Sequence, residues 1–235
     1  MDVPSVQDAS HGRPVPDTQH YGFLLVPGFT FIGFSCALEP LRMANLASGC
    51  PLFQWSTISL DGAPVQASNG IPIQPDHALD DAPPFDTLFV CGSNPIPARI
   101  DSHCLNWLRH RARQGTVLGG ICTGSYWLAR AGLLNGYRCT LHWEDTERLL
   151  TDFPEIIVSK RIYEIDRDRY TCSGGIAPVD LMVALIGQRT GSHEIAAKVS
   201  ELMVCERIRS TQDPQRIPLR QQLGLDPRQG RRVHA

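Results

Sequence analysis

Long apolar runs are absent from this 235-residue chain. A membrane-spanning helix needs ~20 consecutive apolar residues, and no run approaches that length. The first twenty residues are polar and lack the apolar stretch of a secretory signal. We therefore expect a cytoplasmic protein without a membrane partner, with residues 1–20 forming a disordered lead-in.

Cysteine patterns typical of metal binding are also missing. The eight cysteines include no C-x-x-C pair, and none is grouped with histidines at zinc-finger spacing. Because the chain has no export signal and is long enough to need no disulfide staples, reduced thiols are the favoured interpretation. We expect most of them to be small core residues, and we expect neither a metal nor a cofactor.

A surplus of positive charge is absent from the chain as a whole. Its 22 lysines and arginines face 24 aspartates and glutamates, and the formal net charge of -2 argues against a surface that binds nucleic acid throughout. Residues 206–235 differ, because they hold seven arginines against three acidic residues, and three prolines interrupt them. We predict a basic, poorly ordered tail or a linker there.

Strand-like and helix-like segments alternate between residues 21 and 205, without an internal repeat. This alternation predicts an α/β domain with a mainly parallel sheet and helices on both faces. Segments 156–158 and 163–165 are expected to pair as a hairpin closed by residues 166–168. Ligands of such sheets bind at the carboxyl ends of the strands. Four turns are predicted to converge there, at residues 27–29, 92–94, 122–124 and 173–175.

The run Gly119-Gly120-Ile121-Cys122-Thr123-Gly124-Ser125 has the outline of a nucleophile elbow. It follows a strand-like segment and opens a helix-like one, and its glycines allow a sharp turn. The helix N-terminus is expected to favour the thiolate, which makes Cys122 the predicted most reactive thiol. His142 is the one plausible base to pair with it.

Ligand contacts are predicted at the turns and beside His142. Trp143 suits a quaternary ammonium group by cation–π attraction, and glycine N–H groups suit a carboxylate. The predicted contact residues are Gly28, Phe29, Gly92, Ser93, Cys122, Thr123, His142, Trp143, Gly175 and Ile176.

Three motifs together identify a resemblance to a known family. They are G-I-C-T-G at residues 120–124, L-A-R-A-G-L-L-N-G at residues 128–136 and T-L-H-W at residues 140–143. This combination resembles the ThiJ/PfpI superfamily, which is class I glutamine-amidotransferase-like. The resemblance covers residues 21–205, and it implies a flavodoxin-like αβα sandwich with the elbow at Cys122.

A closer resemblance rests on residues 37–42, 172–180, 206–209 and 215–219. These segments are similar to the N-terminal domain of GlxA-type, AraC-family transcriptional regulators, and regulators of choline, betaine and carnitine catabolism are especially similar. The resemblance implies a sensor of a small methylated-amine or amino-acid-like metabolite that forms a homodimer. DNA contact would come only through a C-terminal helix-turn-helix domain, which would begin where this chain stops at Ala235.

One departure from the family bears on catalysis. Catalytic relatives carry a carboxylate that contacts the cysteine, and the matching position here is Gly33. A Cys/His pair without a third orienting group is incomplete, so ligand binding is favoured over turnover. Two alternatives stay open. One is a cysteine-dependent hydrolase, hydratase or amidotransferase-like enzyme using Cys122 and His142, and the other is a redox sensor in which oxidation of Cys122 is the signal.

Overall fold

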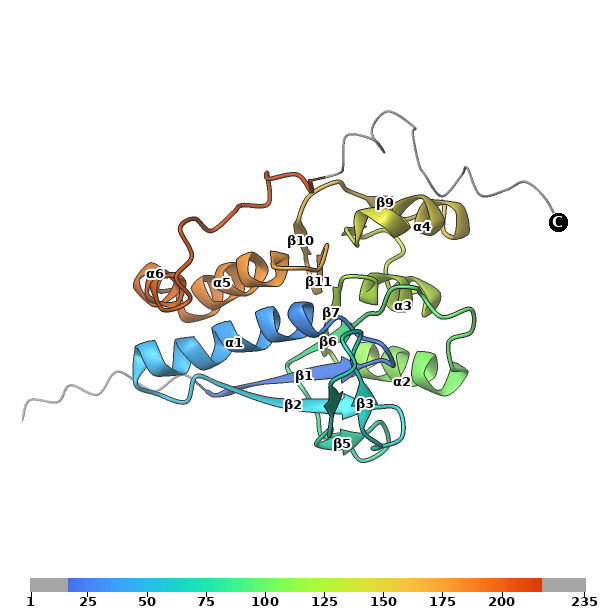
Figure 1. Ribbon diagram of the computed structural model, residues 1–235, viewed down its shortest axis with the longest axis horizontal. Coiled ribbons are helices and arrows are strands. Elements are labelled where there is room, and N and C mark those ends of the chain that lie inside the picture. The colour runs from blue at the N-terminus through green and yellow to red at the C-terminus, as the bar shows by residue number, and fades with distance from the viewer. Residues whose placement is uncertain (1–16, 217–235) are drawn as a thin grey trace, which may run out of the picture.

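A seven-stranded sheet forms the centre of the computed structural model, which describes residues 17–216 (Figure 1). Its strands are β1 (Gln19–Leu25), β2 (Phe53–Ser59), β5 (His77–Ala78), β6 (Thr87–Cys91), β7 (Val117–Ile121), β10 (Tyr163–Asp166) and β11 (Arg169–Cys172). The strand order is β10-β11-β7-β6-β1-β2-β5. All neighbouring pairs are parallel except β10 and β11. The carboxyl ends of the parallel strands therefore lie along one edge.

Helices cover both faces of this sheet. One layer consists of α1 (Phe31–Ser48), α5 (Ala177–Thr190) and α6 (His193–Leu202), which pack against one another (Figure 1). The other contains α2 (Ser102–Arg113), α3 (Gly124–Arg130) and α4 (Thr146–Asp152), with the 3-10 turn η1 (Trp143–Asp145) before α4. Two small sheets, β3 (Val65–Gln66) with β4 (Pro72–Ile73) and β8 (Arg138–Cys139) with β9 (Ile157–Val158), flank this core.

The central strands are apolar on both faces, as a parallel sheet between two helix layers requires. Along β1, Phe23 and Leu25 belong to the core under α1 and α5, whereas Leu24 belongs to the core under α2 and α3. Phe89 on β6 stacks against Phe23, with ring centroids 6.0 Å apart. The predicted α/β class and the flavodoxin-like sandwich are confirmed.

One predicted pairing is wrong. Residues 157–158 form β9, which pairs with β8 rather than with the segment beginning at Tyr163. The hairpin is instead β10 with β11, joined through Arg167 and Asp168. Arg167 adopts a left-handed φ of 54°. Because this position holds no glycine, the sequence gives no signal for the turn.

The chain after α6 runs back across α5 toward β10 (Figure 1), and residues 213–215 bond to residues 160–162. Residues 206–216 are bonded to the domain, as described below, and do not extend away from it. Residues 217–235 of the predicted tail, and residues 1–16 of the predicted lead-in, lie outside the described part of the chain. The domain boundary predicted at Cys205 stays a prediction.

Across residues 17–216, no helix combines the length and the apolar character needed to cross a bilayer.

Candidate functional site

The elbow places Cys122 at the carboxyl end of β7, directly before α3. Its φ of 59° is left-handed, which a non-glycine residue adopts only at a cost of about 1–2 kcal/mol. Gly124 makes this turn possible, because a Cβ built there would collide with the carbonyl oxygen of Val90. The sharp strand-to-helix turn predicted from the glycines is therefore present.

Cys122 lies beneath a second glycine turn. Gly174 has a φ of +85°, and a Cβ built on it would stand 3.0 Å from the Cys122 sulfur and 2.7 Å from its Cβ. The cysteine is only 2% exposed. Gly174 therefore covers the sulfur, and a substrate reaches it only if this turn moves.

The thiol of Cys122 is protonated at neutral pH. Its pKa is raised to about 11; burial is the largest cause, and the negative charges of Asp145 and Glu144 act in the same direction. The backbone N–H of Thr123 and the hydroxyl of Thr30 act in the opposite direction without cancelling the effect of burial. The backbone N–H at the start of α3 acts in favour of the thiolate, as expected, but desolvation outweighs it.

Thr30 occupies the space that a longer side chain at position 33 would need. A Cβ built on Gly33 would lie 2.8 Å from Thr30 Oγ1 and 3.0 Å from Ile121 Cγ2. Thr30 is the N-cap residue of α1, yet its hydroxyl does not cap the helix and is buried beside the thiol of Cys122, whose pKa it lowers. A neutral hydroxyl therefore stands beside Cys122, where the family resemblance implies a carboxylate.

His142 lies directly before η1 and is partly open to solvent. Its Nδ1 is buried and has no hydrogen-bond partner within residues 17–216. The nearest carboxylate oxygen, Glu144 Oε2, is 3.8 Å away and itself accepts a hydrogen bond from Asn94 Nδ2 at 2.8 Å. No hydrogen bond joins His142 to Cys122 in the described chain. The two predicted partners are therefore near one another in the fold without forming a nucleophile–base pair.

A cavity of about 190 Å³ opens beside His142 at the carboxyl edge of the sheet. It is lined by His142, Trp143, Ile162, residues 173–177, Arg209, Gln215 and Arg216. Two of the lining residues each carry one buried polar atom without a hydrogen-bond partner among the described residues: His142 Nδ1 and Gln215 Oε1. Because such atoms are costly when unsatisfied, their occurrence on two residues of one cavity favours a polar occupant.

The predicted contact residues divide between the cavity and the layer beneath it. His142, Trp143, Gly175 and Ile176 line the cavity. Six others do not line the cavity: Gly28, Phe29, Gly92, Ser93, Cys122 and Thr123. They form the packed layer around the elbow, where Phe29 pairs with Ser93 and Thr123 Oγ1 donates to the Ser93 carbonyl at 2.5 Å. The N–H of Gly92 is bonded to the Ile121 carbonyl at 3.0 Å, so it is not free for a ligand.

Sequence reasoning missed Arg209, Gln215 and Arg216. Their segment was interpreted as tail or linker because prolines and arginines dominate it. The available signal was the resemblance of residues 206–209 and 215–219 to the regulators, which carried no information about where these side chains lie.

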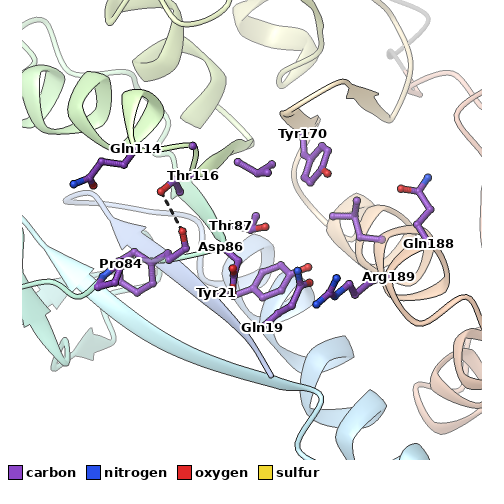
Figure 2. Close-up of a pocket in the computed structure, with 14 residues that line it drawn as sticks. Gln19, Tyr21, Pro84, Asp86, Thr87, Gln114, Thr116, Tyr170, Gln188 and Arg189 are labelled. Carbon is purple, nitrogen blue, oxygen red and sulfur yellow. Dashed lines mark hydrogen bonds between the residues drawn. The ribbon is translucent and has the colours of Figure 1, made fainter. Parts of the chain in front are cut away.

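A larger cavity, of about 750 Å³, lies at the opposite edge, where β1, β6 and β7 begin (Figure 2). Figure 2 shows Arg189 reaching from the end of α5 toward Tyr21. None of the predicted contact residues lines this cavity. Because parallel sheets bind their ligands at the carboxyl edge, we take the smaller cavity beside His142 as the candidate site.

Comparisons with known proteins show which family the chain resembles. The profile of the DJ-1/PfpI family matches residues 23–188. Regulators are among the curated relatives: "HTH-type transcriptional regulator GbdR" of Pseudomonas aeruginosa is 48% identical over 208 residues, which are 88% of this chain and 56% of the relative. "HTH-type transcriptional regulator CdhR" of the same species is 44% identical over 212 residues, covering 90% of this chain and 62% of the relative.

A solved structure supports the same grouping. An AraC family transcriptional regulator from Pseudomonas putida superposes with a TM-score of 0.73 at 28% identity, covering 79% of this chain and 99% of that one. The resemblance to regulator-type ThiJ/PfpI domains is confirmed. The chain spans a little over half the length of the two curated relatives.

Proposed function

This chain belongs to the DJ-1/PfpI family, and from that premise we propose that it binds a small metabolite as the sensing domain of a transcriptional regulator. The observation that carries the proposal is the cavity beside His142: two of its lining residues each have a buried polar atom without a hydrogen-bond partner among residues 17–216. The elbow cysteine, in contrast, is buried and protonated. A site built in this way offers binding groups without an activated nucleophile.

The ligand we propose is a small methylated-amine or amino-acid-like metabolite. The ring of Trp143 lies on the cavity wall, where it can attract a methylated ammonium group. Arg216 lines the same cavity and supplies positive charge for a carboxylate, whereas the charge of Arg209 is already paired with Asp180. A volume of about 190 Å³ suits a metabolite of this size.

DNA contact is proposed for a helix-turn-helix domain beyond these 235 residues. Two relatives named "HTH-type transcriptional regulator" support this proposal.

Calorimetry tests the binding proposal directly. The chain is titrated with glycine betaine, dimethylglycine, carnitine and choline, and we expect at least one of them to bind with a 1:1 stoichiometry. His142→Ala should weaken that binding about tenfold, since it removes one buried polar partner. Arg189→Ala, in the larger cavity, is the matched control and should leave the affinity unchanged. Loss of binding in Arg189→Ala alone would move the site to the opposite edge of the sheet.

Turnover is measured in the same samples by mass spectrometry. We expect the ligand to be recovered unchanged. Product formation near 1 per second that Cys122→Ser abolishes would replace the sensor by the hydrolase, hydratase or amidotransferase-like alternative.

Self-association is proposed for the α6 side of the molecule. Helix α5 offers little surface for this contact, because nine of its residues are buried against its own domain. Leu202 (43% exposed) at the end of α6 and Val204 (90% exposed) beyond it leave apolar surface open. Sedimentation at micromolar concentration should show a species twice the 26.0 kDa chain mass, and Leu202→Asp should shift it toward monomer. A monomer throughout would overturn this assignment.

A further inference from the structure

Residues 206–216, which we call the strap, are fastened across the carboxyl edge of the sheet. Arg209 anchors one end, since its Nε and Nη2 donate to Asp180 Oδ2 at 3.0 and 2.6 Å. Its backbone N–H donates to Asp180 Oδ1 at 2.6 Å. Asp180 lies on α5, and its side chain is only 4% exposed. The strap therefore begins on a buried ion pair.

The other end of the strap pairs with residues 160–162, directly before β10. The N–H of Ile162 donates to the Asp213 carbonyl at 3.1 Å, and the N–H of Gln215 donates to the Lys160 carbonyl at 2.8 Å. Between the two anchors, the strap passes the cavity beside His142 and contributes Arg209, Gln215 and Arg216 to its lining. One wall of the candidate ligand site is thus the segment that leads from the domain toward the C-terminal residues.

The side chain of Gln215 uses only half of its hydrogen-bonding capacity. Its Nε2 donates to Thr140 Oγ1 and the Leu141 carbonyl, both at 2.9 Å, and to the Arg161 carbonyl at 3.2 Å. These three acceptors fix the amide orientation, because a flipped amide would face them with its oxygen. Its Oε1 is consequently an acceptor, buried and without a partner in the described chain.

We propose that Gln215 is a ligand-contacting residue, and that a ligand donating a hydrogen bond to its Oε1 fastens the strap to the domain. The proposal rests on the proposed function, since it concerns the same cavity. It also narrows the ligand class. An acceptor is satisfied only by an N–H or O–H, so the preferred ligand is a small carboxylate that carries a protonated amine or a hydroxyl group. A fully methylated ammonium group, which has no donor, leaves Oε1 unsatisfied.

Strap and ligand are then coupled in both directions. If a bound ligand stabilises the docked strap, the docked strap must raise the affinity for the ligand by the same factor. The strap thereby connects occupancy of the cavity to the position of the residues that follow 216. This connection is what a sensing domain needs in order to report its ligand.

Two substitutions at position 215 separate the roles of the two amide atoms. Gln215→Lys keeps a donor for Thr140, Leu141 and Arg161 and deletes the acceptor. Gln215→Glu keeps acceptors and deletes the donor that holds the strap. The probes are dimethylglycine and glycine betaine, which carry the same charges and differ by one N–H replaced by a methyl group. The ratio of their dissociation constants cancels any general effect of the charge that a substitution introduces.

We expect wild type to bind dimethylglycine about tenfold or more tightly than glycine betaine, since an unsatisfied buried acceptor is costly. Gln215→Lys should bring that ratio near 1, whereas Arg207→Ala, on an exposed part of the strap, should leave it unchanged. If wild type prefers dimethylglycine and Gln215→Lys keeps that preference, only the assignment of Gln215 is overturned. A wild type that binds but prefers the quaternary ligand would overturn the donor requirement. A wild type that binds neither these probes nor carnitine and choline would overturn the proposed function as well.

Proteolysis of wild type supplies a readout that does not depend on the stability of a variant. Trypsin cleaves after Arg207, Arg209 and Arg216, and saturating dimethylglycine should slow these cleavages several-fold relative to cleavage after Arg130. Gln215→Glu should be cleaved rapidly with or without ligand. Equal cleavage rates in bound and free wild type would show that the ligand does not fasten the strap.

Discussion

At the scale of single residues, two side chains hold the same strained backbone for different reasons. Cys122 and Val204 both have left-handed φ angles, of 59° and 54°. Cys122 is buried at the elbow, where the turn brings β7 into α3 and where Gly174 packs on it. Val204 follows α6 and is 90% exposed, with little contact to compensate for the strain. The strained backbone at Cys122 is therefore part of the candidate site, whereas the strain at Val204 serves no packing role.

The first prediction concerns the reactivity of Cys122. With a pKa of about 11, roughly one molecule in ten thousand carries the thiolate at pH 7. Its alkylation rate should therefore rise about tenfold for each pH unit between 7 and 10, because only the deprotonated form attacks. Limiting iodoacetamide followed by peptide mapping should label the partly exposed Cys36, Cys50 and Cys205 before Cys122 at pH 7.

This outcome is the reverse of what the elbow motif suggests from sequence. Rapid labelling of Cys122 at pH 7, with a rate that does not depend on pH, would mean that the thiolate is present despite its burial. It would also strengthen the redox-sensor alternative, since that mechanism needs an accessible thiolate.

The second prediction concerns Val204. Val204→Gly should raise the free energy of unfolding by about 0.5–1 kcal/mol, because glycine adopts the left-handed conformation without strain and loses little packing here. The gain is smaller than the full strain because glycine also makes the unfolded chain more flexible. Denaturant melts measure it.

The matched control is Ala197→Gly, at an exposed position in the middle of α6, which should instead cost about 1 kcal/mol in helix propensity. Equal destabilisation by both substitutions would show that Val204 is not strained.

At the scale of elements, the sequence predicts what is local and misses what depends on distant partners. The apolar runs that became β1, β2, β6 and β7 were recognisable, because strands buried on both faces read as continuous hydrophobic segments. The β10–β11 hairpin was misplaced because its turn contains Arg167 rather than glycine. The elbow was visible in its glycines, whereas the covering of Cys122 by Gly174 depends on a turn fifty residues away.

The strap illustrates the same limit. Its prolines and arginines are typical of a linker, and its attachment depends on Asp180, Lys160 and Thr140, none of which is near it in sequence. A short segment without apolar periodicity gives no local signal for such bonds. Three of the eleven residues that line the candidate site, Arg209, Gln215 and Arg216, were therefore beyond reach of the sequence.

The third prediction tests the anchor of the strap. Arg209→Ala should lower the free energy of unfolding by about 2–4 kcal/mol, because it leaves the carboxylate of Asp180 buried without its partner. Arg207→Ala is the matched control: its ion pair with Asp213 has an arginine that is 69% exposed, and such a pair contributes at most about 1 kcal/mol. Thermal and urea melts of the two variants give the comparison. A loss of less than 1 kcal/mol in Arg209→Ala would mean that the strap is only loosely held.

At the scale of the whole molecule, the charge distribution bears on the DNA partner. The chain carries a formal net charge of -2. Within the described part of the strap, Arg207 and Arg209 are paired with Asp213 and Asp180, each at 2.6 Å. Exposed α6 carries Glu194 and Glu201 against one lysine, so its surface repels phosphate. The arginine-rich composition of residues 206–235 therefore overstates the positive charge that is free to meet DNA.

The last prediction is that these 235 residues alone do not bind DNA with sequence selectivity. Specific recognition requires an element that enters a groove and presents side chains to base edges. The charges just described give no basic surface to position such an element. Weak binding to random duplexes is expected at ~50 mM salt through the arginines beyond position 216, and it should be lost by ~200 mM because released counterions drive it. A mobility-shift assay at both salt concentrations measures this. Truncation after Arg216 is the control and should abolish the low-salt binding. Retardation that selects one sequence and survives ~200 mM salt would show that this chain recognises DNA without a further domain.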